Sequence, residues 1–211
     1  MLTLYYSPGA CSMASHIGLE EAGAVYVEKP TLLAKGEHKT EAYLKINPRA
    51  KVPALSVDGR IITENTAILT YLARQFPQAN LLPADLVGEA HCIGAMTWLS
   101  TIVHPSYQRY TRPERFAEGE AAQARVKDMG YKSHWASLQE IDSLLEGKHW
   151  MMGKQYTVVD PYALVFYSWG VRGGFPMKEL VAYTAWKERM LARPAVMKIL
   201  ESEQNVPLRT A

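Results

Sequence analysis

Hydrophobic and polar residues follow two different spacings in the first eighty positions of the chain. Leu2, Leu4 and Tyr6 alternate with polar or smaller residues, as expected of a half-buried strand. Met13 and Ile17 then begin a helical spacing after a turn. Extended over this part of the chain, the pattern predicts strands at 2–6, 24–29, 52–57 and 60–63 and helices at 11–23, 40–46 and 64–76.

The order of these elements predicts a small α/β sheet. The first strand–helix–strand unit requires a right-handed crossover between parallel strands. Asp58 and Gly59 separate the last two predicted strands, which is a strong hairpin signal. A helix over 64–76 would then cover the sheet. Parallel pairing in the first half and a hairpin in the second give the thioredoxin-like arrangement.

No strand pattern continues beyond about residue 90. Proline and glycine residues separate the helical stretches, and the segment 77–88 carries Pro77, Pro83 and Gly88. We therefore expect an α/β domain over 1–80, a linker over 81–88 and an all-helical domain over 89–211. The helices expected in the last part cover 89–108, 114–147, 157–172, 178–192 and 194–203.

Composition excludes several classes of protein. The 211 residues are 48% hydrophobic, which is enough to bury a substantial core. With 23 basic and 21 acidic residues, the net charge of +2 offers no electrostatic basis for binding nucleic acid or a membrane surface. There are two cysteines, which suits a reducing cytoplasm. We expect no signal peptide and no apolar run of the ~18 residues that a membrane helix needs.

The turn before the first helix holds the most informative residue. Residues 5–18 are YYSPGACSMASHIG, and they place Cys11 where a strand passes into a helix. The partial positive charge of a helix N-terminus lowers a thiol pKa. We therefore expect a functional thiol with a depressed pKa, the alternative being an inert buried cysteine. Cys92 lies among apolar residues and is interpreted as core.

Two further segments are suited to bind a peptide-like ligand. Val52-Pro53 begins a strand; we expect a trans bond, because cis is the rarer form, although a cis bond would turn the Val52 main chain toward an extended ligand. Residues 63–66 (Thr-Glu-Asn-Thr) open a helix. Its N–H groups suit a carboxylate and Glu64 suits an ammonium group, but taken singly these residues favour simple capping.

A lysine, a histidine and a capping motif are further candidates for site residues. Lys35 lies in a polar loop and would meet a ligand carboxylate, but taken alone it is better explained as an ordinary solvated lysine. His104 precedes Pro105, which is expected to kink or end its helix, and it would donate to an anion, move a proton or answer the helix dipole. Thr157 and Asp160 form a capping box, for which we favour a structural role. The six histidines show no metal-ligand spacing, so no metal is expected.

Taken together, the motifs are more specific than any one of them. YYSPGACS, INPRAKVPAL and ITENTAILTYLA, followed by a helical half with VHPSY and YTVVDPYA, resemble the cytosolic glutathione transferases over essentially the whole chain. The cysteine in the turn is similar to the signature of the bacterial beta class. The resemblance implies the glutathione transferase fold, glutathione as co-substrate without another cofactor, and a cytoplasmic homodimer acting in detoxification.

By this resemblance, four residues lie around the sulfur of glutathione. Cys11 matches the class cysteine, which faces that sulfur and can form a mixed disulfide with it. Tyr6 and Ser12 match hydroxyl residues near the sulfur. His104 matches the histidine that the helical domain contributes. These four are the expected catalytic residues.

The resemblance also assigns the residues that bind the tripeptide. The Val52 main chain before Pro53 pairs with the cysteinyl part. Glu64 and Asn65 hold the γ-glutamyl end; many relatives have serine at the second position, where the main-chain N–H still serves. Lys35 meets the glycyl carboxylate.

Two positions depart from the family pattern. Pro105 stands where close relatives often have lysine, so one positive charge near the sulfur is missing. Ser100, which we assign to the glutathione site, stands where relatives can have asparagine. Both departures bear on how strongly the site activates a thiol.

The leading hypothesis is conjugation of the glutathione thiolate to a small hydrophobic electrophile. The electrophile would lie against the helical domain, with Tyr107, Tyr110, Trp169 and Phe175 as candidate walls. One rival is thiol–disulfide exchange or peroxide reduction through Cys11, which would need glutathione to resolve it because position 14 is alanine. The other is a non-catalytic protein that binds glutathione.

Overall fold

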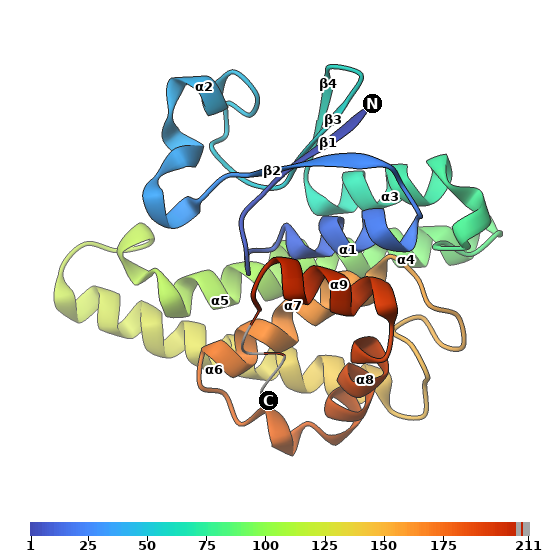
Figure 1. Cartoon of the computed structure of the whole chain (residues 1–211). Helices are drawn as coiled ribbons and strands as arrows, with labels where there is room; N and C mark the ends of the chain where they lie inside the picture. Colours follow the sequence, from blue (N-terminus) through green and yellow to red (C-terminus); the bar gives the residue numbers. More distant parts are fainter. Residues whose placement is uncertain (206–207, 209–211) are drawn as a thin grey trace.

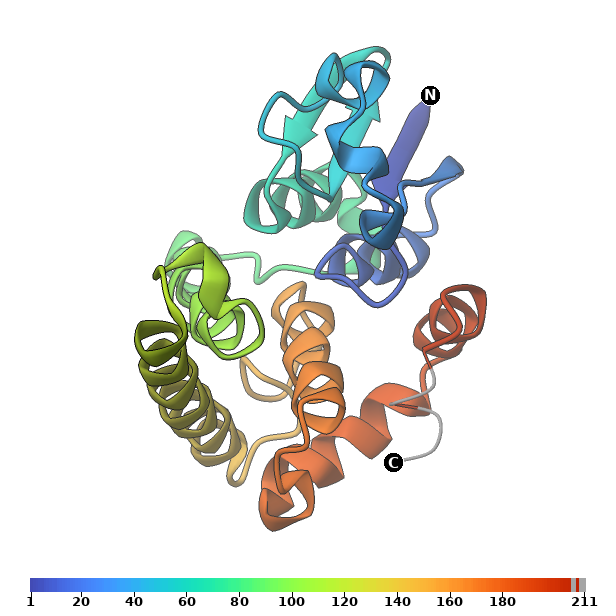
Figure 2. The same cartoon turned by 90° about the vertical axis from the view of Figure 1, so that its left-hand side faces the viewer.

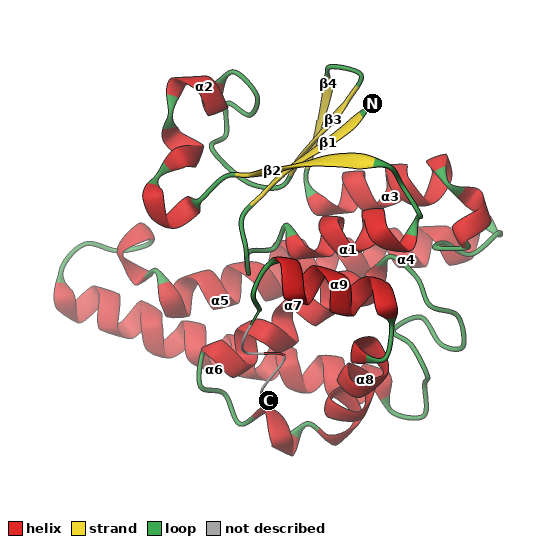
Figure 3. Cartoon of the chain, in the orientation of Figure 1, coloured by secondary structure: helices red, strands yellow, loops and turns green. Residues whose placement is uncertain are grey.

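The sheet in the computed structural model has the predicted topology. The structure describes residues 1–205 and 208. Four strands, β1 (Leu2–Tyr6), β2 (Tyr26–Pro30), β3 (Ala54–Val57) and β4 (Arg60–Thr63), lie in the order β2-β1-β3-β4 (Figure 3). β1 pairs parallel with β2 and antiparallel with β3, and β3 forms the hairpin with β4. The predicted α/β arrangement is therefore confirmed.

Two helices, α1 (Met13–Glu21) and α3 (Asn65–Gln75), pack beneath the sheet, while α2 (Glu41–Leu44) lies to one side of it (Figure 1). Inward-facing residues of β1 and β3, such as Leu4 and Leu55, form a core with α3. Gly18 lets α1 and α3 approach, because a Cβ there would come within 2.6 Å of Leu69 Cδ2. In the folded chain, strand β1 of this sheet therefore leads into helix α1, which packs against α3.

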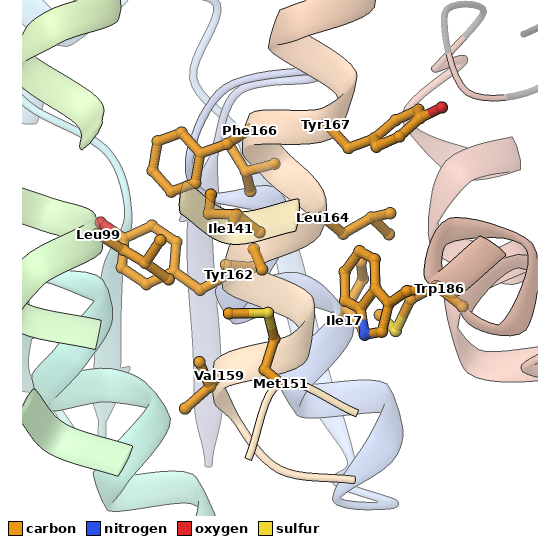
Figure 4. Packing of buried hydrophobic residues seen from close by; sticks show 14 of the residues in the cluster. Ile17, Leu99, Ile141, Met151, Val159, Tyr162, Leu164, Phe166, Tyr167 and Trp186 are labelled. Atoms are coloured by element: carbon orange, nitrogen blue, oxygen red, sulfur yellow. The ribbon is translucent and has the colours of Figure 1, made fainter. Parts of the chain in front are cut away.

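The second half of the chain is helical. It comprises α4 (Leu86–Trp98), α5 (His104–Thr111), α6 (Glu120–Leu145), α7 (Val159–Arg172), α8 (Val181–Leu191) and α9 (Pro194–Ser202). Helix α7 is buried from Val159 to Gly170. Figure 4 shows its side chains meeting Ile17 of α1, Ile141 of α6 and Trp186 of α8. Because α1 contributes to this core, the two halves of the molecule are packed together (Figure 2).

The sequence predicts that Pro105 kinks or ends its helix, and the structure excludes the second of these effects. Helix continues from Leu86 to Thr111, and residues 99–103 form a π-helical turn just before the proline. Proline lacks an N–H group and its ring crowds the carbonyl one turn earlier, and a π turn accommodates both. His104 therefore lies within a long helix rather than near an end.

The same helix corrects a second expectation. Among the described residues, Leu86–Thr111 is long and apolar enough to cross a membrane by length and composition alone. This is weak evidence, because core helices of soluble proteins meet the same test. Cys92, Met96, Leu99 and Val103 of this helix are buried in the helical core.

The capping box at the start of α7 is confirmed. Thr157 N donates to Asp160 Oδ2 at 2.8 Å, and Val159 N donates to Thr157 Oγ1 at 3.3 Å. Asp160 Oδ1 also accepts from Met151 N at 2.8 Å and from Trp186 Nε1 at 3.0 Å. The Thr157 hydroxyl is a fourth donor, at 3.3 Å from Asp160 Oδ2. The carboxyl is fully buried, and this burial raises its pKa to about 6 despite the four donors.

Asp160 should make stability depend on pH. Its pKa is higher in the folded chain, so the folded state binds more protons and stability is lost as pH rises through about 6. Between about pH 4.5 and 7.5, the unfolding free energy of the wild type should fall by about 2 kcal/mol more than that of Asp160→Asn. Urea unfolding followed by tryptophan fluorescence measures both, and parallel pH profiles would contradict the assignment.

Candidate functional site

A cavity of about 150 Å³ lies between the α/β half and the helix α4–α5. Seven of the ten residues expected at the site line it: Cys11, Val52, Pro53, Glu64, Asn65, Ser100 and His104. The remaining lining residues are Asn47, Lys51, Thr63, Pro105, Gln108 and Tyr162. Residues from five separate segments of the chain therefore meet at one place.

Tyr6, Ser12 and Lys35 do not line this cavity. The Tyr6 hydroxyl donates to Glu28 Oε2 at 3.1 Å. Ser12 Oγ donates to Ser7 O at 3.2 Å and accepts from Ser7 N at 3.1 Å, which closes the turn before α1. Lys35 is exposed at the end of a short 3₁₀ turn. The Ser12 hydroxyl therefore shapes the turn, whereas the Tyr6 hydroxyl binds a side chain of strand β2.

The turn itself is fixed through Gly9, which has a φ of +67°. The Gly9 carbonyl accepts from Arg172 Nη2 at 2.7 Å and from Trp169 Nε1 at 3.1 Å. Its N–H donates to Glu203 Oε2 at 2.9 Å. Glu203 is buried, and its other oxygen contacts His16 Nδ1 at 2.8 Å. Residues of α7 and of the segment after α9 thus hold the turn that carries Cys11.

Cys11 has a neutral thiol, which reverses the expectation of a depressed pKa. The residue is partly exposed, but burial of the sulfur raises its pKa to about 12, and the charge of Glu64 acts in the same direction. The N–H groups of Cys11 and Ser12 and the charge of Lys51 oppose the rise without reversing it. Cys11 Sγ lies 3.5 Å from Val52 O, to which the thiol donates.

The Val52-Pro53 bond is cis, so the expected trans bond is wrong. The loop that leads to it is held at one point. Both the Tyr43 hydroxyl and Asn47 Nδ2 donate to Lys51 O, each at 2.7 Å. This fixes the main chain beside the cavity and leaves the Lys51 side chain exposed at its rim.

The start of α3 forms another wall. Asn65 Nδ2 donates to Cys11 O at 2.9 Å, and Asn65 Oδ1 accepts from Ser15 Oγ at 2.6 Å. The Asn65 side chain therefore joins α3 to the turn rather than facing the cavity alone. Glu64 precedes the helix with a φ of +71°. The N–H groups of the first helical turn have no partner within α3, so they suit a carboxylate at this end of the cavity.

His104 is neutral. Burial, assisted by the nearby charge of Lys51, lowers its pKa to about 4. Its Nε2 lies 2.9 Å from Gln108 Nε2, and its ring packs edge-on against Trp169 with centroids 4.8 Å apart. The ring therefore offers a neutral hydrogen-bonding group at pH 7. Lys51, not His104, brings positive charge to this cavity.

Some of the residues that the sequence analysis missed carry a readable signal. Gln108 lies four residues after His104, the spacing that puts two side chains on one helix face. Lys51 directly precedes Val52, already assigned to the site. Tyr162 gave no such signal, since it lies within a continuous apolar stretch. Within the described part of the chain, no group of three His, Cys, Asp or Glu residues is placed to hold a metal ion.

Cys11 should alkylate slowly at neutral pH. Because the thiolate is the reactive form, the iodoacetamide rate should rise about tenfold per pH unit from about pH 7 to 10 without a plateau. Peptide mass spectrometry separates the Cys11 adduct from any adduct at the fully buried Cys92. A plateau reached below about pH 8 would show that the thiol has a low pKa and contradict the burial argument.

Comparison with known proteins gives consistent results. The sequence profile for "Glutathione S-transferase, N-terminal domain" matches residues 1–74. The chain is 31% identical over 208 residues to glutathione S-transferase GstA of Escherichia coli O157:H7, covering 96% of this chain and 98% of that protein. It is 28% identical to glutathione S-transferase GST-4.5 of Xanthomonas campestris, over 96% and 98% of the two chains.

Solved structures resemble the whole chain. A glutathione transferase homologue from Sulfitobacter with bound glutathione superposes with a TM-score of 0.90 at 30% identity, over 96% of this chain and 98% of that one. A sphingomonad glutathione S-transferase complexed with glutathione gives 0.84 at 34% identity, over 96% and 98%. A beta-class enzyme of Sphingomonas chungbukensis gives 0.84 at 32% identity, over 97% and 100%.

Proposed function

Because the chain belongs to the cytosolic glutathione S-transferase superfamily, we propose that it conjugates the glutathione thiolate to a small hydrophobic electrophile. It is a glutathione transferase, and glutathione is its co-substrate. In this proposal, residues 1–80 bind glutathione, residues 81–88 form the linker, and residues 89–211 hold the electrophile.

The observation that carries the proposal is the combination of groups around the first cavity. Glutathione is an extended tripeptide with a thiol near its middle and charges at both ends. The cavity offers the main chain at Val52 for pairing, the start of α3 for a carboxylate, and Glu64 for an ammonium group. Cys11 lies among these groups, where the sulfur of the tripeptide is expected.

The turn before α1 would stabilise the thiolate. The N–H groups of Cys11 and Ser12 already favour negative charge at the Cys11 sulfur. We propose that they act in the same way on the glutathione sulfur, and that Lys51 supplies the charge that Pro105 does not. The thiol proton leaves to solvent, and the sulfur lone pair then attacks the electrophile.

In this proposal, Cys11 assists the nucleophile rather than acting as it. Its neutral thiol is a hydrogen-bond donor, and a thiol with a pKa of about 12 attacks disulfides slowly at pH 7. We therefore propose that reduction of disulfides or peroxides through Cys11 is a secondary activity, in which the oxidised Cys11 is reduced again by glutathione, and glutathione leaves as its disulfide. His104 and Ser100 shape the wall facing the sulfur, in keeping with their place in the cavity.

Replacing Cys11 should separate the two activities. Removing one hydrogen-bond donor in Cys11→Ala should lower kcat/KM for 1-chloro-2,4-dinitrobenzene by about tenfold or less. Cys11→Ser is the matched control, because it restores a donor without a redox-active sulfur, and its conjugation rate should return toward the wild type. Disulfide reductase activity should be lost in both variants. A loss of conjugation above about a thousandfold in both variants would contradict an assisting role and make the Cys11 sulfur essential to the reaction.

We also propose that the protein is a cytoplasmic homodimer with a role in detoxification, as the family resemblance implies. Light scattering at micromolar concentration should give twice the chain mass of 23.7 kDa. A mass equal to one chain across the whole concentration range would overturn the dimer and leave the proposed chemistry standing.

A further inference from the structure

A second, larger cavity of about 500 Å³ lies in the helical half, within the size range of small-molecule sites. Its lining residues come from α5 and the turn after it, from α6 and from the end of α7. The residues that line it are Tyr107, Tyr110, Thr111, Arg112, Pro113, Lys127, Arg172 and Gly173. The fold and the first cavity do not account for this set.

All the charged side chains that line this cavity are positive. Arg112, Lys127 and Arg172 line it, and none of its lining residues is acidic. Within residues 1–205 and 208, none of the three cations forms an ion pair with a carboxylate. Lys127 Nζ lies 5.9 Å from the centre of the Tyr110 ring, and Arg172 binds only a main-chain carbonyl. Three cations without an acidic partner favour an anion.

Aromatic rings form the other side. Tyr107 stacks on Trp169 with centroids 4.8 Å apart and planes 20° apart. The Tyr110 hydroxyl donates to Gly173 O at 3.1 Å, so it is already used. The Tyr107 hydroxyl has no hydrogen-bond partner in the described part of the chain, although the residue is only 9% exposed. A flat ligand would therefore meet the exposed part of the Tyr107 ring and one available donor.

The cavity adjoins the place where the sulfur reacts. Arg172 lies over Gly9, with its guanidinium nitrogens 3.6 and 3.7 Å from where a Cβ would stand. Gly9 is two residues before Cys11 in the same turn. Trp169 contacts both Tyr107 of this cavity and His104 of the first one. The two cavities have no lining residue in common, but the Trp169 ring lies between a lining residue of each.

We propose that this cavity selects planar electrophiles that carry a carboxylate, with Arg112 and Arg172 holding the carboxylate and Tyr107 facing the ring. The inference rests on the proposed conjugation and narrows its substrate class. For an aryl halide, the sulfur lone pair forms the C–S bond, and chloride leaves with the electron pair of the C–Cl bond. The thiol proton goes to solvent.

The test compares two substrates that differ in charge at one group: 4-chloro-3-nitrobenzoate and its methyl ester. Each kcat/KM is divided by the uncatalysed rate, because the ester is intrinsically more reactive. We expect the wild type to favour the carboxylate by about tenfold or more, which is the effect of a charge-assisted hydrogen bond. Arg112→Gln and Arg172→Gln should each reduce this preference, and the former does not touch the turn at Gly9.

Arg125→Gln is the matched control, since it removes one exposed positive charge from α6 outside the cavity. It should leave the preference unchanged. Two results would overturn the inference and leave the proposed conjugation standing. One is an equal corrected kcat/KM of the wild type for the acid and the ester. The other is a preference that Arg125→Gln lowers as much as Arg112→Gln does.

A binding measurement tests the anionic site independently of the proposed conjugation. Calorimetry compares the two conjugates, S-(4-carboxy-2-nitrophenyl)glutathione and its methyl ester, without requiring turnover. Tighter binding of the charged conjugate, weakened about tenfold by Arg112→Gln, supports the anionic site. If neither halide is turned over, that binding result still supports the site, while the proposed conjugation is contradicted. Equal affinity for both conjugates overturns the anionic site.

Discussion

The peptide groups on either side of Gly9 are the constraint on which both cavities depend. The Gly9 carbonyl receives donors from Trp169 and Arg172, and its N–H reaches the buried Glu203. Each of these partners comes from the helical half or the segment after it, whereas the turn belongs to the sheet. The position of Cys11 relative to the helical wall is therefore set by three hydrogen bonds between the two halves. The large core around α7 makes those bonds rigid, because α1 packs into the same core.

Burial, more than helix position, determines the charges in the site. A cysteine next to a helix start is expected to ionise easily, yet desolvation of the Cys11 sulfur outweighs the nearby N–H groups. The same effect keeps His104 neutral. The first cavity thus combines neutral hydrogen-bonding groups with the charges of Lys51 and Glu64, while the second gathers Arg112, Lys127 and Arg172. One cavity suits a thiol that must become an anion, and the other suits a ligand that already is one.

The sequence allowed the sheet, its order and most helices to be predicted, because periodic apolar positions and the Asp58-Gly59 turn are local signals. It also located seven lining residues of the site through motif resemblance. What it missed depends on long-range burial. The hydroxyls of Tyr6 and Ser12 are hydrogen-bonded to other residues of the protein, which the sequence pattern did not predict. The helix continues through Pro105 by means of a π turn. The second cavity joins residues about sixty positions apart, which no motif connects.

The bond from Gly9 to Glu203 spans 194 residues and has a consequence for the making of the protein. At ordinary translation speeds, the turn is synthesised roughly 10 to 40 s before its carboxylate partner. Until then the cysteine-bearing turn lacks one of its three hydrogen bonds to the helical half. The position of Cys11 is therefore completed only once residue 203 has been made.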